Sequence, residues 1–129
     1  MALSNDEVTA LLAIFTGIEP DFCSIGFTAL QDLFKDHPEL QEYFKDMDLN
    51  KHGGTVMCSA YGYLKCYGTL PEDWARLQEL HTNKLKLTVE IIKLLAMCIV
   101  VVIVSRCAAV DRSALEKFLN EVAESLIIS

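Results

Sequence analysis

The sequence predicts an all-α fold of about six to seven helices, in a single domain that spans residues 1–129. Hydrophobic residues make up 52% of the chain, whereas there are only 6 Gly and 3 Pro, which favours long uninterrupted elements over a turn-rich sheet fold. Apolar residues recur at intervals of three and four along most of the chain, as they do on one face of a helix. A chain of this length can bury a core of its own.

The first two helices are separated by a proline. Ser4 and Glu7 have the S-x-x-E pattern of a capping box, which predicts a helix that runs from there to about Glu19. Pro20 interrupts that helix, and His37-Pro38 ends the next one, because the residue before a proline is pushed away from helical angles. The second helix carries an apolar stripe made of Phe22, Ile25, Ala29, Leu30, Leu33 and Phe34.

A third helix is predicted from about residue 46 to residue 67, with Gly68 as its stop. The segment Thr69-Leu70-Pro71-Glu72 predicts a second capping box and the start of a short fourth helix. One face of the third helix carries His52, Val56, Ala60, Tyr63 and Leu64. The short helix presents Trp74, Leu77 and His81 at intervals of three and four.

Two further helices are predicted to begin near Thr88 and near Asp111, the second with Ser113 and Glu116 as another S-x-x-E pair. The first of them, ending at about Arg106, is apolar all round between residues 94 and 104. This apolar run is well short of the ~20 residues needed to cross a bilayer. An outward apolar stripe on this helix would be a surface for self-association, so a homodimer is predicted. The last helix has an apolar face made of Leu115, Phe118, Leu119, Val122 and Leu126.

The charge and the cysteines limit the possible partners and the compartment. A net charge of -7 leaves no basic stripe for phosphates, so nucleic acid is not expected as a partner. The five cysteines show no framework spacing, which favours reduced thiols in the cytoplasm. The start MALSNDEV does not look like a secretory signal, and no membrane partner is expected.

His52 and His81 lie 29 positions apart, each on an otherwise apolar helix face. One such histidine is most often a structural side chain with satisfied hydrogen bonds. Two of them suggest a metal-centred ligand held between two helices. Zinc or a di-iron centre would lack ligands, because no carboxylate stands beside either histidine at the required spacing. Heme needs only one protein ligand, since its porphyrin supplies four nitrogens and one position can stay open for a diatomic gas.

Three motifs resemble those of the globin family. The segment Leu33-Phe34-Lys35-Asp36-His37-Pro38-Glu39, followed by Phe44, resembles the end of the second helix, the turn after it and the phenylalanine that wedges the heme. Lys51-His52-Gly53-Gly54-Thr55-Val56 resembles the distal K-H-G-x-x-V motif, and Leu77-x-x-Leu80-His81 matches the proximal motif. The resemblance covers nearly the whole chain and implies a globin fold around a pocket for heme b.

This resemblance implies a role for each residue of the pocket. His81 would be the proximal ligand of the iron, oriented by the carbonyl of Leu77, and His52 would donate a hydrogen bond to bound O₂. Leu30, Phe44 and Val56 would complete the gas pocket. Further apolar heme contacts are expected from Leu87, Ile92, Leu95 and Phe118, with ordinary core packing an equal alternative for the last three. Lys51 and Lys84 are candidate partners for the heme propionates.

The connection before the distal helix departs from the family. Only seven residues separate Phe44 from His52, fewer than in vertebrate globins, so the small fourth helix of the family should be missing. A short tether could also pull the helix that carries His52 toward the iron. Direct ligation of the iron by His52, as a second axial ligand, is therefore an alternative to a purely distal role.

These features predict a protein that is not an enzyme and that binds O₂ reversibly, for storage or transport, together with the gases CO and NO. A heme enzyme that acts on nitric oxide or peroxide is an alternative, although the distal Arg and the proximal carboxylate of fast peroxidases are not visible. A six-coordinate globin with both histidines on the iron, acting in redox chemistry or as a sensor, is another. The third alternative function is that of a heme-free interaction module on a helical scaffold.

Overall fold

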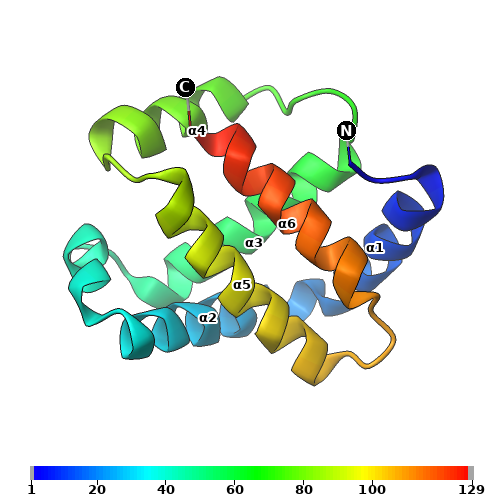
Figure 1. Cartoon of the computed structure of the whole chain (residues 1–129), viewed down its shortest axis with the longest axis horizontal. Coiled ribbons are helices and arrows are strands. Elements are labelled where there is room, and N and C mark those ends of the chain that lie inside the picture. Colours follow the sequence, from blue (N-terminus) through cyan, green and yellow to red (C-terminus); the bar gives the residue numbers. More distant parts are fainter. Residues whose placement is uncertain (1, 128–129) are drawn as a thin grey trace.

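The computed structural model describes residues 2–127, except for the side chain of Lys84, and it is helical throughout its core (Figure 1). No strand occurs in that part of the chain, so the all-α prediction is confirmed. The α-helices are α1 (Asn5–Ile18), α2 (Phe22–Asp36), α3 (Leu49–Lys65), α4 (Trp74–Glu79), α5 (Val89–Arg106) and α6 (Arg112–Leu126). Three shorter helical turns join them: two 3₁₀ turns, η1 (Glu19–Asp21) and η2 (Pro38–Phe44), and a π-helical turn, η3 (Leu80–Lys84).

The helix ends follow local chemistry at most places. The capping box of Ser4 and Glu7 is confirmed, with the Glu7 amide donating to Ser4 Oγ over 3.2 Å and the Ser4 amide donating to Glu7 Oε1 over 3.0 Å. The predicted start of α5 is also confirmed, since Thr88 accepts a hydrogen bond from the Ile91 amide. These side chains satisfy backbone N–H groups that a helix leaves unpaired at its start.

Two predicted capping boxes are wrong. The Thr69 hydroxyl donates to the Cys66 carbonyl over 3.1 Å and so closes the turn after α3, and α4 begins only at Trp74. At α6 the cap is Asp111, whose carboxylate accepts from the Ala114 amide over 3.2 Å. Ser113 therefore already lies inside α6. At α6 an earlier polar group, Asp111, takes the capping role that the pattern predicts for Ser113, whereas α4 begins without a side-chain cap.

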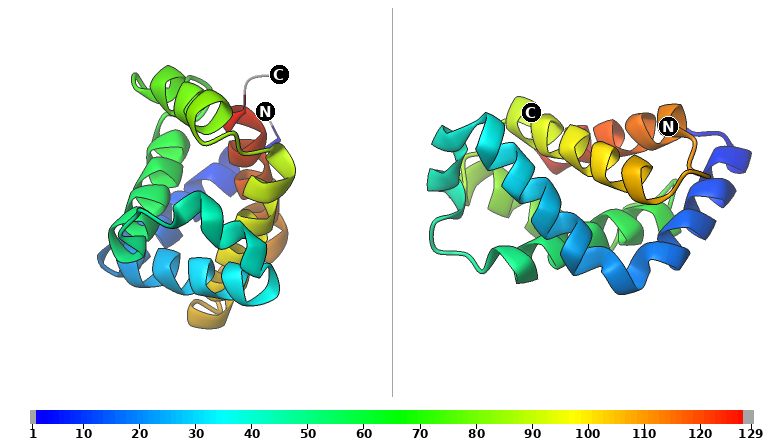
Figure 2. Two further views of the ribbon diagram at one scale, coloured as in Figure 1. Left: turned by 90° about the vertical axis from the view of Figure 1, so that its left-hand side faces the viewer. Right: turned by 90° about the horizontal axis from the view of Figure 1, so that it is seen from below.

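The helices pack in crossed pairs. α2 lies across α3, α5 packs on α2, and α5 and α6 run antiparallel side by side (Figures 1 and 2). α1 covers α3 and α6 at the other end of the molecule. Phe15, Trp74 and Phe118 are fully enclosed in the main core, and a second apolar cluster fills the corner between α2 and η2. That second cluster consists of Leu30, Leu33, Phe34, Leu40 and Phe44.

The corner before α3 is short, as predicted. Only residues 45–48 separate η2 from α3, and they form a turn in which the Met47 amide donates to the Phe44 carbonyl over 3.0 Å. No helix lies between η2 and α3 in this described stretch, so the small fourth helix of the family is absent. Phe44 is thereby held one short turn away from the beginning of the helix that carries His52.

One helical stretch, Asn5–Asp36, would be long and apolar enough to cross a membrane by length and composition alone. It bends at the 3₁₀ turn Glu19–Asp21, where Pro20 interrupts the α-helical hydrogen bonds. Its two halves, α1 and α2, both pack against α3, and α2 also packs against α5. The apolar faces of this stretch are therefore used in helix packing.

Candidate functional site

His81 lies in the π-helical turn that extends α4. The Leu85 amide donates to the Leu80 carbonyl over 2.9 Å, a five-residue spacing that widens the helix at this point. His81 Nδ1 lies 2.7 Å from the carbonyl oxygen of Leu77. A carbonyl oxygen can only accept, so Nδ1 carries the proton and Nε2 keeps its lone pair. Within the described residues, Nε2 makes no hydrogen bond and is available as a ligand atom.

His52 lies in the first turns of α3, and its ring is half-buried beside Phe44. The two ring centroids are 5.5 Å apart, with the ring planes at 54°. Burial and, to a lesser degree, the charge of His81 lower the pKa of His52 from its usual value. His52 is therefore neutral near pH 7, with one ring nitrogen as a donor and the other as an acceptor.

Both histidines line an apolar cavity between α3, the segment of α4 and η3, α5 and α6. The main chamber has a volume of about 160 Å³, and a smaller chamber of about 50 Å³ adjoins it. The chambers share part of their walls, so they are two parts of one space. The shared residues are His52, Val56, His81, Ile92, Leu95 and Leu126.

Most of the residues that the sequence predicts for the site meet at this cavity. Those in its walls are Phe44, His52, Val56, Leu77, His81, Leu87, Ile92 and Leu95. Two others lie elsewhere. Leu30 is fully buried in the corner cluster beside Phe44, and Phe118 is fully buried in the main core, with its ring 5.6 Å from that of Phe15. For Phe118 the structure has the ordinary core packing that the sequence left as an alternative.

Several wall residues are not among those that the sequence predicts for the site. Trp74 and Leu80 come from α4 and η3, Thr55 and Ser59 from α3, and Leu126 from the end of α6. Trp74 and Leu126 were visible in the sequence as members of apolar helix faces. That pattern predicts burial, but it does not say whether a residue faces the cavity or the solid core. Leu80 is the residue directly before His81, and its side chain adds apolar surface beside the imidazole.

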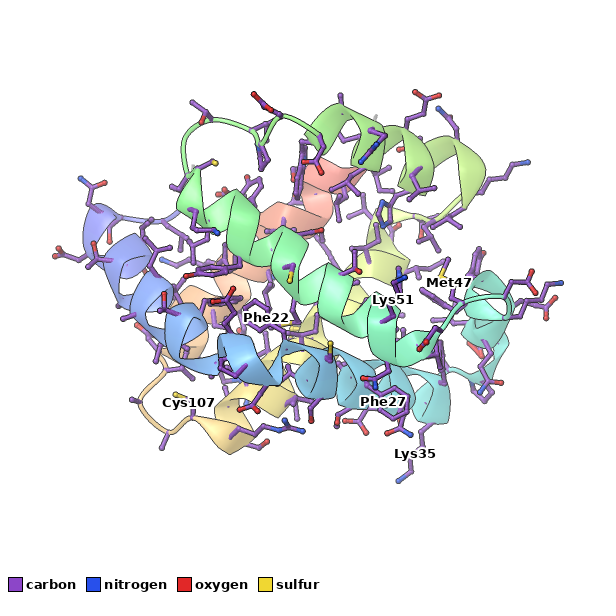
Figure 3. All side chains as sticks on the ribbon, turned by 180° about the vertical axis from the view of Figure 1, so that it is seen from behind. Phe22, Phe27, Lys35, Met47, Lys51 and Cys107 are labelled. Atoms are coloured by element: carbon purple, nitrogen blue, oxygen red, sulfur yellow. The ribbon has the colours of Figure 1, made fainter. Side chains whose placement is uncertain are left out.

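Lys51, a predicted partner for acidic groups of a ligand, is exposed on the outer side of α3 near its beginning (Figure 3). It lines a surface groove with Cys23 and Cys58, and that groove shares Thr55, Ser59, Trp74 and Leu77 with the main chamber. The side chain of Lys84 lies outside the described part of the structure. All five cysteines are unpaired.

The chemistry of the cavity limits which metal group it could hold. In the part of the chain that the structure describes, no three His, Cys, Asp or Glu side chains are grouped so that they could share a metal ion. Zinc usually requires three or four such ligands, so a bare ion does not fit. A macrocycle that brings its own four nitrogens needs only axial donors, and His81 and His52 are suitable donors in an apolar wall. The residues therefore fit heme.

The size of the cavity limits which groups it can hold without a movement of its walls. Both chambers are smaller than the ~300 Å³ at which pockets for organic ligands usually begin. A group as large as a porphyrin therefore requires α3 and the segment of α4 and η3 to move apart. α4 has only six residues and packs mainly against α6 and η3, so this segment is the part of the wall that can shift most easily.

Comparison with known proteins agrees with this geometry. A family model described as Globin matches residues 28–126, which include α3, α4, α5 and both histidines. The chain is 32% identical over 135 aligned positions to the hemoglobin heart muscle subunit alpha-type of Aquarana catesbeiana. That alignment covers 98% of this chain and 99% of that protein.

Proposed function

The chain belongs to the globin family, and from that membership we propose that it holds heme b in the cavity between His52 and His81 and binds O₂ reversibly, for storage or transport. Membership of the family implies heme binding in general. The observation that supports this particular site is the oriented imidazole of His81, whose Nδ1 is 2.7 Å from the Leu77 carbonyl in the wall of an apolar cavity.

His81 is proposed as the proximal ligand of the iron. Its hydrogen bond to Leu77 selects the tautomer with a free Nε2 and limits the rotation of the ring. A backbone carbonyl is held in place by the helix, so this orientation does not depend on a second side chain. Leu80, in the position before His81, offers no side-chain hydrogen bond to add to it.

His52 is proposed as the distal residue, which donates a hydrogen bond to the gas. When bound, heme would supply a ferrous iron that can take up O₂, CO or NO. The lowered pKa of His52 keeps the ring neutral near pH 7, so it can offer one N–H without bringing a full charge into the cavity. A hydrogen bond of this kind favours O₂ over CO, which is less polar.

The remaining wall residues are proposed to keep water out of the site. Phe44 is 5% exposed and packs between Phe34 and the ring of His52, which closes the cavity at the corner before α3. Val56, one turn after His52 on α3, lines both chambers and limits their size. An apolar wall without free water slows the loss of an electron from ferrous heme.

A second candidate is a six-coordinate globin in which His52 also binds the iron, with a role in redox chemistry or sensing. The observation that favours it is the short connection of residues 45–48, which holds α3 close to η2, together with the position of both imidazoles in the wall of one cavity. Catalysis on nitric oxide or peroxide would be a side activity of either form. The unpaired cysteines support a place in the cytoplasm, and the exposed apolar side of α5 supports a homodimer.

Absorption spectra of the purified protein test the proposal. The ferrous protein should show a Soret band that shifts reversibly on addition of O₂ or CO, and His81→Ala should lose most of the heme. His37→Gln, which changes the third histidine, whose side chain is 39% exposed, should behave as the wild type does. A six-coordinate ferrous spectrum that becomes five-coordinate in His52→Leu would select the second candidate. Failure to retain heme in the wild type would refute both.

A further inference from the structure

Arg106, the last residue of α5, contacts two hydroxyl groups near the beginning of α2. Its Nη1 donates to Ser24 Oγ over 3.0 Å, and its Nη2 donates to Thr28 Oγ1 over 3.3 Å. Ser24 and Thr28 are four residues apart and share one face of the helix, so the planar guanidinium group spans both of them. Phe22, at the start of α2, and Cys107, directly after α5, mark this junction in Figure 3.

Arg106 has no carboxylate partner in the described part of the structure. None of the ion pairs found there includes it, although the sequence has 18 Asp and Glu residues against 11 Lys and Arg residues. The other arginine of this end of the chain, Arg112, has such a partner, because its Nε donates to Glu116 Oε1 over 2.9 Å. Arg106 is therefore a permanent charge that faces two neutral hydroxyls, whereas hydrogen bonds to an oxyanion are roughly twice as strong.

Ser24 is the more accessible of the two hydroxyl residues. Its side chain is exposed, whereas Thr28 is half-buried. Ser24 also lies in the first turn of α2, directly after the 3₁₀ turn Glu19–Asp21, and the ends of a helix open more readily than its middle. Asp21 and Glu19 precede it by three and five residues. An enzyme that recognises acidic residues before a serine would find both the charge pattern and the hydroxyl at the surface.

A phosphate group on Ser24 would satisfy Arg106 better than the hydroxyl does. Such a group carries a charge of about −1.5 to −2 near pH 7 and has three acceptor oxygens. Two of these oxygens match the two terminal N–H groups of a guanidinium fork. Nη1 already lies 3.0 Å from Oγ, the atom that would carry the phosphorus, so the arginine has little distance to move. The nearby carboxylate of Asp21 would repel the phosphate, but this carboxylate is exposed and its charge is screened by salt.

We infer that Ser24 is a phosphorylation site and that Arg106 holds its phosphate, which fastens the beginning of α2 to the end of α5. The inference goes beyond the proposed function and does not depend on heme, because neither residue lines the cavity. It adds a modification that acts on the contact between two of the central helices.

The phosphoryl group would come from ATP through a protein serine/threonine kinase. The bond between Ser24 Oγ and the γ-phosphorus forms, and the bond between that phosphorus and the oxygen bridging to the β-phosphate breaks. ADP is the leaving group, and the proton of the hydroxyl passes to solution. No oxidant or reductant is needed. The product replaces a neutral hydrogen bond between α2 and α5 by charge-assisted ones.

A kinase assay on the full-length chain tests the site. The folded protein is incubated with a serine/threonine kinase that recognises acidic residues before its target, together with ATP labelled in the γ-phosphoryl group, and mass spectrometry locates the label. We expect the label on Ser24 and its loss in Ser24→Ala. Ser105→Ala, which removes an exposed hydroxyl one residue before Arg106, should keep the wild-type incorporation. A folded chain that takes up no phosphate, or takes it up only at other residues, would overturn the inference.

A second experiment tests the role of Arg106 separately from the kinase. Phosphoserine is incorporated at position 24 during translation, and phosphorus-31 NMR follows the titration of the phosphate. The guanidinium favours the doubly charged form, so the second pKa of the phosphate should lie about half a unit below its ordinary value of about 6. The urea midpoint of unfolding should also rise above that of the unmodified chain. Both effects should disappear in Arg106→Gln.

Two further variants separate the shape of the guanidinium from its charge. Arg106→Lys keeps the charge but not the planar fork, so it should keep only part of the change in phosphate pKa. Arg112→Gln removes a positive charge elsewhere on the surface and should leave the phosphate unaffected. Circular dichroism checks that each variant is folded. The same phosphate pKa in the wild type and in Arg106→Gln would show that the phosphate extends into solvent, and this result would overturn the role of Arg106.

Discussion

Gly26 in α2 and Gly53 in α3 pack backbone against backbone where the two helices cross. A Cβ added at Gly53 would lie 2.6 Å from the carbonyl carbon of Gly26 and 2.6 Å from the amide nitrogen of Phe27, a separation that real Cβ atoms essentially never show. Only glycine permits helices to approach this closely. Because His52 directly precedes Gly53, this contact also sets how far the distal imidazole lies from α2.

Gly53→Ala should therefore destabilise the protein by about 1–3 kcal/mol, because α2 and α3 must separate to make room for the methyl group. Urea unfolding measures this loss, and the Soret absorbance of the heme-loaded variant should fall as the cavity deforms. Gly62→Ala is the control, since it lies in the same helix and a Cβ there meets nothing within 4 Å. We expect it to be neutral or to stabilise α3 by about 0.5–1 kcal/mol. Equal losses of unfolding free energy in Gly53→Ala and Gly62→Ala would show that the close approach of α2 and α3 at Gly53 does not determine the stability.

The buried His52 should make stability depend on pH. Because its pKa in the folded protein is lowered from the usual value of 6.5, the folded state favours the neutral ring. The corresponding stability is present in full above pH 6.5 and should fall as the pH drops below 6.5 toward the folded pKa. Denaturant midpoints measured through this interval should show the fall in the wild type and less of it in His52→Leu. His37→Gln, at a more exposed histidine, should keep the wild-type slope. If the wild type, His52→Leu and His37→Gln all showed the same slope, the pH dependence of stability would arise from groups other than His52.

Asp48 caps the helix that carries His52, and its removal should loosen the distal side. Its carboxylate accepts from the amides of Asn50 and Lys51 over 3.1 and 3.2 Å. Asp48→Ala should cost about 0.5–2 kcal/mol of unfolding free energy and should speed hydrogen exchange at both amides. Asp46→Ala removes an exposed carboxylate just before the helix and should change neither quantity. Unchanged exchange in Asp48→Ala would mean that packing alone holds the first turn.

An apolar stripe on the outer side of α5 should join two copies of the chain. Leu94, Met97 and Val101 are 37%, 38% and 50% exposed, and they follow one another at intervals of three and four. Sedimentation velocity should show a homodimer that Met97→Glu and Val101→Glu both convert to a monomer, because a buried unpaired charge is costly. Leu70→Glu, at a large apolar residue exposed in a loop away from α5, should leave the dimer intact. A wild-type monomer at high micromolar concentration would exclude this interface.

The helix boundaries could be predicted because their causes are local. The Ser4 and Glu7 box, the Thr88 cap and the proline after His37 act within one turn of the chain, so the sequence around them is sufficient. The two predicted capping boxes that are wrong fail because an S/T-x-x-E pattern does not fix the residue at which a helix begins. At α6 the Asp111 carboxylate lies closer to the free amides than Ser113 does, and α4 begins at Trp74 without a side-chain cap; the pattern of residue types alone does not reveal either position.

The cavity could be predicted only in part. The motifs around His52 and His81 selected the two imidazoles, and six of the residues expected around them line the same space. Trp74 and Leu126 could not be assigned to it in the same way, and Phe118 and Leu30 lie in the packed core. Helical periodicity predicts which side of a helix is buried, but the angle at which helices cross decides which buried residue borders an open space.

The sequence by itself therefore determined an all-α chain, the approximate extent of each helix and the pair of histidines on two apolar faces. Only the tertiary structure decided that Gly26 meets Gly53, and that Glu121 of α6 accepts hydrogen bonds from both Tyr63 and Tyr67. The physical reason is separation along the chain. Caps and turns depend on neighbours within a few residues, whereas these contacts join positions 27 or more residues apart and exist only once close packing has fixed the helix crossings.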